Sequence, residues 1–157
     1  MPVYTGSCFC RKIEYELRLG SADDARTTLC HCRNCKKAFG TNYGLTAKVP
    51  KDSFHLTKGQ PKEHAGDNGS GATIYRYFCD TCGSFILEFG ASCSPQIRMR
   101  SLADRRQENA KDHFRYICVG SLDDPEALPP KGEFFCKARA SWMPEIPDVF
   151  HKQEIQK

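Results

Sequence analysis

The 157-residue chain lacks the features that mark several large classes of protein. It has no apolar run of about eighteen residues, the length that a membrane-spanning helix needs. Its first six residues have neither the basic start nor the apolar middle of a signal peptide. An internal repeat, a glycine-rich phosphate loop and a Ser/His/Asp signature are also missing. We therefore expect a cytoplasmic protein, in a reducing compartment, outside the nucleotide-binding and serine-hydrolase classes.

Cysteine, by contrast, is abundant, and seven of the ten cysteines fall into three clusters. The clusters are one C-x-C, one C-H-C-x-x-C and one C-x-x-C group: Cys8 and Cys10; Cys30, Cys32 and Cys35; Cys79 and Cys82. Two thiolates of a C-x-x-C can enter one coordination shell with bonds of ~2.3 Å, and soft sulfur ligands favour zinc. Disulfides are the alternative, but cysteines two residues apart cannot bridge without strain, and nothing marks the chain as secreted. The clusters therefore predict metal binding.

The number of ligands predicts two different zinc sites, hence two zinc ions per chain. If the C-x-C and C-x-x-C groups combine, they form a closed four-thiolate site: Cys8, Cys10, Cys79 and Cys82. The C-H-C-x-x-C group then supplies three ligands and leaves a fourth position for water or an incoming ligand: Cys30, Cys32 and Cys35. His31 could be the fourth ligand, but its place between two ligands favours a side chain that points the opposite way.

Composition and charge describe an ordinary soluble protein. Hydrophobic residues make up 39% of the chain and charged residues 27%, and the length predicts a single domain over residues 1–157. The formal net charge is +4. Seven bound thiolates and two zinc ions would bring this charge to about +1, which does not favour a nucleic-acid partner. The sequence predicts no membrane partner and does not define an oligomeric state.

Alternating and apolar stretches predict short strands rather than long helices. We expect strands at residues 12–19, 43–50, 53–57, 73–78, 84–89, 114–119 and 133–138, with an extended piece at 27–29. Residues 36–40 predict one helical turn closed by Gly40. Residues 92–113 are rich in charge and poor in large apolar side chains, so we interpret them as an inserted loop. The pattern indicates a mainly antiparallel all-β fold.

Five motifs in this order resemble the glutathione-dependent formaldehyde-activating family, which includes the centromere protein V type. They are residues 6–10, 30–35, 78–84, 119–125 and 139–142. The resemblance implies a zinc-pinned β-tent of layered antiparallel sheets. It also implies a structural zinc on the four cysteines and a second zinc, on the other three, whose open position takes the glutathione sulfur. The chain departs from the family at Arg11-Lys12, where the family usually has Gly-Ala, and in the length of the 92–113 insertion. Three cysteines belong to no cluster and are expected to be buried or free thiols: Cys93, Cys118 and Cys136.

The resemblance implies a zinc-dependent carbon-sulfur lyase of the S-(hydroxymethyl)glutathione synthase type, which adds glutathione thiolate to formaldehyde or a related small electrophile. Candidates to hold the carboxylates of glutathione are the basic residues near the three-cysteine group: Arg33, Lys36, Lys37 and Lys48. Tyr43 and His64 are candidates to donate the proton to the product oxygen. One alternative is a lyase or transferase that acts on a larger glutathione adduct. Another is a non-catalytic zinc module that binds a protein or chromatin partner.

Overall fold

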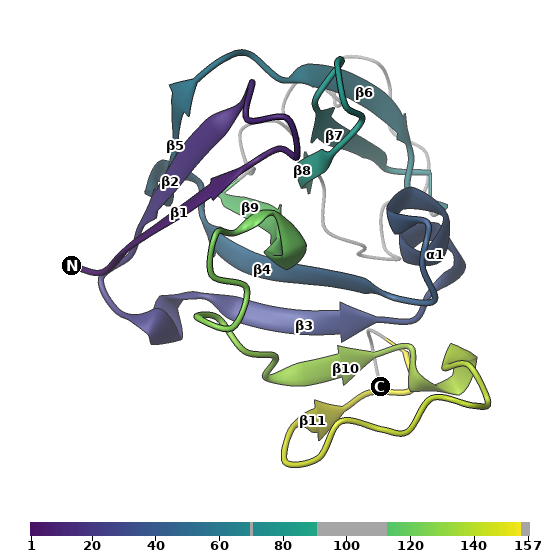
Figure 1. Cartoon of the computed structure of the whole chain (residues 1–157). Coiled ribbons are helices and arrows are strands. Elements are labelled where there is room, and N and C mark those ends of the chain that lie inside the picture. The colour runs from purple at the N-terminus through teal and green to yellow at the C-terminus, as the bar shows by residue number, and fades with distance from the viewer. Residues whose placement is uncertain (70, 91–112, 155–157) are drawn as a thin grey trace.

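The strands of the computed structural model, which describes residues 1–69, 71–90 and 113–154, form two sheets (Figure 1). The smaller sheet is antiparallel, in the order β1 (Val3–Ser7), β2 (Glu14–Arg18), β5 (Phe54–Lys58). The larger sheet has the order β11 (Phe150–His151), β10 (Gly132–Phe134), β3 (Arg26–Cys30), β4 (Gly44–Pro50), β9 (Phe114–Cys118), β8 (Phe85–Gly90), β7 (Thr73–Phe78), β6 (Lys62–Asp67). Its pairs are antiparallel except at β10, which is parallel to β3 and β11. The mainly β, single-domain fold predicted from the sequence is confirmed.

The core lies between the two sheets and follows the alternation of the strands. Tyr15 and Leu17 on β2 are 1% and 0% exposed, whereas their neighbours Glu14 and Glu16 are half-buried. These inward side chains belong to one apolar cluster with Ile86 and other residues of the larger sheet. Burial of this kind contributes about 25 cal/mol for each Å² of apolar surface removed from water. A continuous apolar core thus holds the two sheets together.

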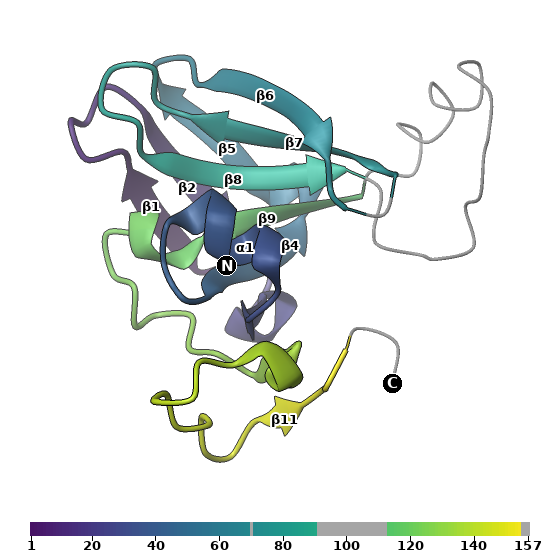
Figure 2. The ribbon, with the colours of Figure 1, turned by 90° about the vertical axis from the view of Figure 1, so that its right-hand side faces the viewer.

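One short helix, α1 (Arg33–Phe39), follows β3 and leads into β4. It begins after Cys32, whose Sγ accepts a hydrogen bond from the Cys35 amide, and it ends at Gly40, which has a φ of 65°. Glycine adopts this left-handed conformation without steric cost. Figure 2 shows α1 between strands β6, β7 and β8 on one side and the segment that carries β11 on the other. The predicted turn at 36–40 was right in its glycine end, but the helix starts earlier because Cys32 caps it.

Single-turn 3₁₀-helices complete the described structure: η1 (Ala22–Asp24), η2 (Lys51–Ser53), η4 (Val119–Ser121) and η5 (Cys136–Ala138). The predicted strand at 133–138 was wrong beyond residue 134, because Phe135 has a φ of 54° and the chain turns into η5. Strands β1, β6 and β11 were not predicted. The expected insertion at 92–113 lies outside the described residues except for His113. No helix among the described residues is long and apolar enough to span a membrane.

Candidate metal centres

Four cysteines from two distant turns bring their sulfur atoms together. Cys8 and Cys10 lie on the connection between β1 and β2, and Cys79 and Cys82 lie on the turn between β7 and β8. Their Sγ atoms all lie within 4.8 Å of one another. The Cys8–Cys10 distance is 3.6 Å and the Cys10–Cys79 distance is 3.8 Å. Tetrahedral zinc with ~2.3 Å bonds separates its sulfur ligands by roughly 3.8 Å, so this donor set fits the metal.

Backbone geometry directs the β1–β2 connection toward this cluster, and Lys12 links it to the other turn. The Ile13 amide donates to Cys8 Sγ at 3.3 Å, and Arg11 adopts a left-handed conformation with a φ of 59°. Glycine adopts that conformation without strain, which is a physical reason for the usual glycine of the resembled family at this position. Lys12 joins the two turns on the outside, because its Nζ donates to Asp80 Oδ1 at 2.9 Å and to Thr81 Oγ1 at 2.8 Å.

The turn between β7 and β8 is closed by backbone hydrogen bonds and stabilises the thiolate of Cys82. The Cys79 amide donates to the Ser84 carbonyl at 2.9 Å, and Gly83, with a φ of 76°, returns its amide to the Cys79 carbonyl at 2.9 Å. Ser84 Oγ lies 3.2 Å from Cys82 Sγ, and hydrogen bonding from Ser84 lowers the pKa of Cys82 to about 5. A thiol with this pKa is ionised at neutral pH, as a metal ligand must be.

The other three clustered cysteines meet where β3 ends and α1 begins. The Sγ atoms of Cys30, Cys32 and Cys35 lie within 4.8 Å of one another, and all three residues are half-buried. The hydrogen bonds of Cys30 and Cys35 lower the pKa of Cys32 to about 2, and the adjacent Cys32 raises the pKa of Cys30 to about 12. Three convergent soft donors fit a tetrahedral metal and leave one position for another ligand.

His31 points away from these sulfur atoms into the protein. Its side chain is 0% exposed, and its Nε2 lies 2.9 Å from Oε1 of Glu133, which is also fully buried. His31 is outside the group of atoms that could hold a metal, as its place between two cysteines predicted. The sequence did not reveal Glu133 as the partner of His31, because the two residues are 102 positions apart.

The four basic candidates for glutathione binding lie in different surroundings. Arg33 and Lys37 are exposed on α1, beside the three cysteines in sequence. Lys36 Nζ donates to the Ala138 carbonyl at 2.6 Å and is thereby tied to the C-terminal segment. Lys48 lies four residues beyond Gly44, the β4 partner of Cys30, which is roughly 13 Å along the strand. Its Nζ lies 4.0 Å from the centre of the Phe114 ring, and burial lowers its pKa. This position gives Lys48 no support as a glutathione contact.

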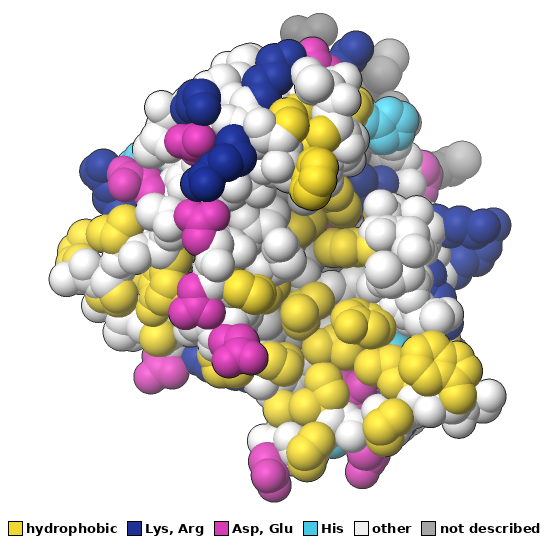
Figure 3. Space-filling view, viewed as in Figure 1, with side chains coloured by type: hydrophobic (Ala, Val, Ile, Leu, Met, Phe, Trp, Pro, Cys, Tyr) yellow, Lys and Arg dark blue, Asp and Glu magenta, His cyan; other side chains and the backbone are white. Residues whose placement is uncertain are grey.

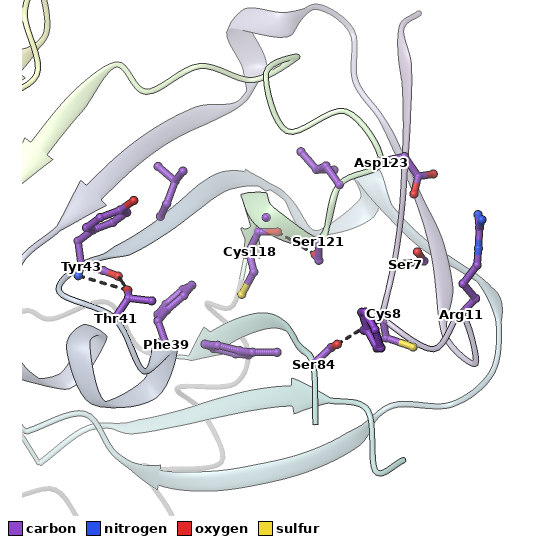
Figure 4. A pocket seen from close by; sticks show the side chains of 15 residues that line it. Ser7, Cys8, Arg11, Phe39, Thr41, Tyr43, Ser84, Cys118, Ser121 and Asp123 are labelled. Atoms are coloured by element: carbon purple, nitrogen blue, oxygen red, sulfur yellow. Dashed lines mark hydrogen bonds between the residues drawn. The ribbon is translucent and has the colours of Figure 1, made fainter. Parts of the chain in front are cut away.

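Of the two proton-donor candidates, Tyr43 is the better placed. Its ring lies edge-on to His31 with centroids 6.5 Å apart, and it lines a pocket of about 740 Å³ (Figure 4). His64 is exposed on β6 and does not line this pocket. The pocket is bounded by Phe39 and Phe85, whose ring centroids are 4.9 Å apart, and it reaches the Cys8 turn.

The pocket and the three-cysteine cluster share a wall. None of the three cysteines lines the pocket, but Phe39 follows Cys35 by one helical turn and does. A Cβ built on Gly44 would lie 2.8 Å from the Phe39 ring and 3.0 Å from Cys35 Cβ. The wall that carries Phe39 is therefore packed directly beside Cys35. Figure 3 shows apolar side chains across the middle and lower part of the face that Figure 1 presents.

A half-buried ion pair near the three cysteines was also missed from the sequence. Arg76 Nε on β7 lies 3.1 Å from Glu88 Oε2 on β8, and these residues are cross-strand partners. Burial raises the pKa of Glu88, Arg76 opposes the rise, and Cys32 adds to it. Alternation along each strand could have placed the two side chains on one face, but it could not have shown that the charge of Cys32 acts on Glu88. The unclustered Cys118 and Cys136 are buried and free, whereas Cys93 lies outside the described residues.

Comparison with known proteins gives two findings. A family model described as "Glutathione-dependent formaldehyde-activating enzyme" matches residues 3–138. Among solved structures, the crystal structure of a Rhodobacter sphaeroides protein matches with 18% sequence identity and a TM-score of 0.49, over 76% of this chain and 87% of that chain.

Proposed function

Since the chain belongs to the glutathione-dependent formaldehyde-activating enzyme family, we propose that it is a zinc-dependent carbon-sulfur lyase that adds glutathione thiolate to formaldehyde or a related small electrophile. The observation that carries this proposal is the convergence of three sulfur ligands, and no fourth among the described residues, at the β3–α1 junction. A fourth sulfur, from glutathione, would complete the tetrahedral set. The cluster of four cysteines would hold a structural zinc.

In the proposed reaction, Cys30, Cys32 and Cys35 hold the zinc. When bound, the zinc stabilises a thiolate and so makes a nucleophile available at neutral pH from a thiol whose free pKa is roughly 8.5. The glutathione sulfur loses its proton and bonds to the carbonyl carbon, the C=O π electrons move to oxygen, and that oxygen takes up a proton. The product is a hemithioacetal.

The surrounding residues would bind and orient the tripeptide. Arg33 and Lys37 are exposed on the helix that carries Cys35, where they can pair with the glutathione carboxylates. Among the residues that the structure describes, no other side chain forms a hydrogen bond with the Tyr43 hydroxyl, so it is free to donate to the product oxygen. Lys36 would act indirectly, because its bond to Ala138 fixes α1 against the C-terminal segment.

The proposal is tested by the rate at which formaldehyde and its glutathione hemithioacetal interconvert. Exchange NMR with ¹³C-formaldehyde and glutathione measures this rate directly, and the uncatalysed reaction supplies the baseline. The zinc-loaded protein should accelerate exchange, Cys32→Ser should return the rate to the baseline, and His64→Ala should leave the acceleration intact. Exchange at the baseline rate in the unaltered protein would contradict the proposal and favour a non-catalytic zinc module.

A larger glutathione adduct is the second candidate substrate, and the pocket favours it. About 740 Å³ bounded by aromatic rings far exceeds what formaldehyde, with two heavy atoms, would occupy. Leu45→Trp, on the pocket wall, should slow reaction with an aromatic aldehyde and leave formaldehyde exchange unchanged. An equal effect on both aldehydes would remove the reason for preferring a larger adduct.

A further inference from the structure

The side chains of residues 30 to 32 alternate between the two sides of an extended segment. Cys30 is the last residue of β3, and Cys32 has extended dihedral angles, with φ −66° and ψ 155°. In extended chain, neighbouring side chains point to opposite sides. Cys30 and Cys32 can therefore face one metal only while His31 faces away from it. The conformation of the segment is thus coupled to the place that His31 takes inside the protein.

The carboxylate of Glu133 contacts His31 and several other groups. Glu133 Oε1 lies 2.9 Å from His31 Nε2. Its other oxygen, Oε2, accepts from Arg139 Nη2 at 2.9 Å and from the Ile146 amide at 3.3 Å. His151 Nε2 lies 2.9 Å from the same oxygen and 3.0 Å from the Ile146 carbonyl. Thus Oε1 contacts the cysteine segment, and Oε2 contacts the C-terminal segment.

The backbone holds Glu133 in register with the cysteine segment. On β10, Glu133 is paired with Leu29 and Phe134 with Cys30, and the His31 amide donates to the Phe134 carbonyl at 3.0 Å. The Lys152 amide donates to the Glu133 carbonyl at 2.9 Å, which ties the opposite side of β10 to the chain beyond β11. Glu133 therefore sits on a strand that is fixed on both edges.

We propose that Glu133 is a positioning residue that holds His31 inward and thereby keeps Cys30 and Cys32 aimed at one metal ion. The chemistry requires a carboxylate, because the position must accept from an imidazole N–H on one oxygen and from a guanidinium on the other while fully buried. An apolar residue would leave buried donors of His31 and Arg139 without partners. The inference rests on metal binding by the three cysteines, which is part of the proposed function, but not on the reaction.

The test measures the zinc affinity of the three-cysteine site by competition with a chromophoric chelator, starting from protein loaded with two zinc ions. Alkylation followed by mass spectrometry identifies which cysteines each variant exposes. Glu133→Gln and His31→Leu should weaken this site by roughly 10- to 100-fold, the usual effect of losing a partner behind a ligand. Alkylation should then appear at Cys30, Cys32 and Cys35 before it appears at the four cysteines of the other cluster, Cys8, Cys10, Cys79 and Cys82.

Two further variants separate positioning from simple loss of stability. His31→Gln places a donor near the position of Nε2, so it should restore the affinity that His31→Leu loses. Tyr15→Phe removes a partly buried hydrogen bond of 2.7 Å to Ser121, away from the three cysteines, so it should lower the Tm without weakening their zinc. If Glu133→Gln fails to fold, the two His31 variants decide the question.

Equal zinc affinity in His31→Leu and the unaltered protein would overturn the inference, as would a loss in His31→Leu that His31→Gln does not restore. A failure of the proposed function looks different. In that case Glu133→Gln still weakens zinc binding, but the unaltered protein does not accelerate hemithioacetal exchange.

Discussion

The two cysteine clusters differ in how much of the chain each one joins. The four-cysteine cluster unites the β1–β2 connection of the smaller sheet with the β7–β8 turn of the larger sheet, and 69 residues separate Cys10 from Cys79. Cys8 and Cys79 are 1% and 0% exposed, whereas Cys82 is half-buried and Cys10 is exposed. The three-cysteine cluster comes from one six-residue segment, and all of its members are half-buried.

This difference explains why one cluster suits structure and the other suits chemistry. A metal that joins distant segments removes much conformational entropy from the unfolded chain and so contributes to folding. A metal held by three residues of one local segment joins little, and the three-cysteine set leaves one tetrahedral position for a ligand. The predictions below test this division, beginning with the largest expected effect.

Cys79→Ser should abolish the native fold, because it removes a ligand that links the two sheets. We expect insoluble protein, or soluble protein that has lost its near-UV circular dichroism and its cooperative thermal transition. Excess chelator should produce the same state in the unaltered protein. A Cys79→Ser variant with the Tm and metal content of the unaltered protein would show that this cluster is not a structural zinc site.

Cys32→Ser should remove about one zinc per chain and leave the fold, because the other site still joins the sheets. Atomic absorption gives the metal content, and circular dichroism gives the structure. Glutathione binding, measured by calorimetry, should disappear with this zinc. If Cys32→Ser unfolds the protein as Cys79→Ser does, the two clusters do not differ in the way proposed here.

Glu133→Gln should lower the free energy of unfolding at pH 7 by about 3 kcal/mol, because it leaves part of a buried ion pair uncompensated. Burial alone would raise the pKa of Glu133, but hydrogen bonds from His31 and Arg139 hold it below its ordinary value. The stabilising contribution is therefore present above the unfolded-state pKa of 4.5 and is lost as pH falls through the folded-state pKa. Urea unfolding at several pH values should show the difference between the two proteins shrinking below pH ~4.5. A constant difference would show that the charge of Glu133 is not what stabilises the fold.

Lys12→Met should have the smallest effect, although Lys12 also connects the two turns. Its ion pair with Asp80 is solvent-exposed, and exposed pairs of this kind contribute little to stability. The Tm and the content of two zinc ions should stay within experimental error of the unaltered protein. Loss of zinc in this variant would show that the ion pair, rather than the four cysteines, aligns the turns.

The difference between a four-cysteine and a three-cysteine cluster was largely predictable from the spacing of the cysteines in the sequence. The C-x-C, C-x-x-C and C-H-C-x-x-C groups predicted which cysteines would meet, because close ligands on turns have few other arrangements. The apolar and alternating stretches on either side of Cys79 and Cys82 likewise predicted strands β7 and β8. These are local properties, and local properties can be recognised in sequence.

The rest depends on long-range contacts that spacing does not encode. The strand β6 has largely exposed residues and no clear alternation, so only its pairing with β7 reveals it. The partnership of His31 with Glu133 depends on parallel pairing of β3 with β10, whose residues are more than 100 positions apart. Sequence alone therefore predicted which cysteines converge but not that Glu133 contacts His31.

The coordination of the second zinc is the most direct test of the central claim, that the three-cysteine site takes a thiol as its fourth ligand. Zinc X-ray absorption should be recorded with and without glutathione, in protein loaded with two zinc ions. Glutathione should raise the sulfur coordination of this zinc from three to four, whereas S-methylglutathione, which cannot supply a thiolate, should not. At a hundredfold excess over its Kd, glutathione should also stabilise the protein by about 2.7 kcal/mol. Unchanged sulfur coordination and an unchanged Tm at millimolar glutathione would contradict the account.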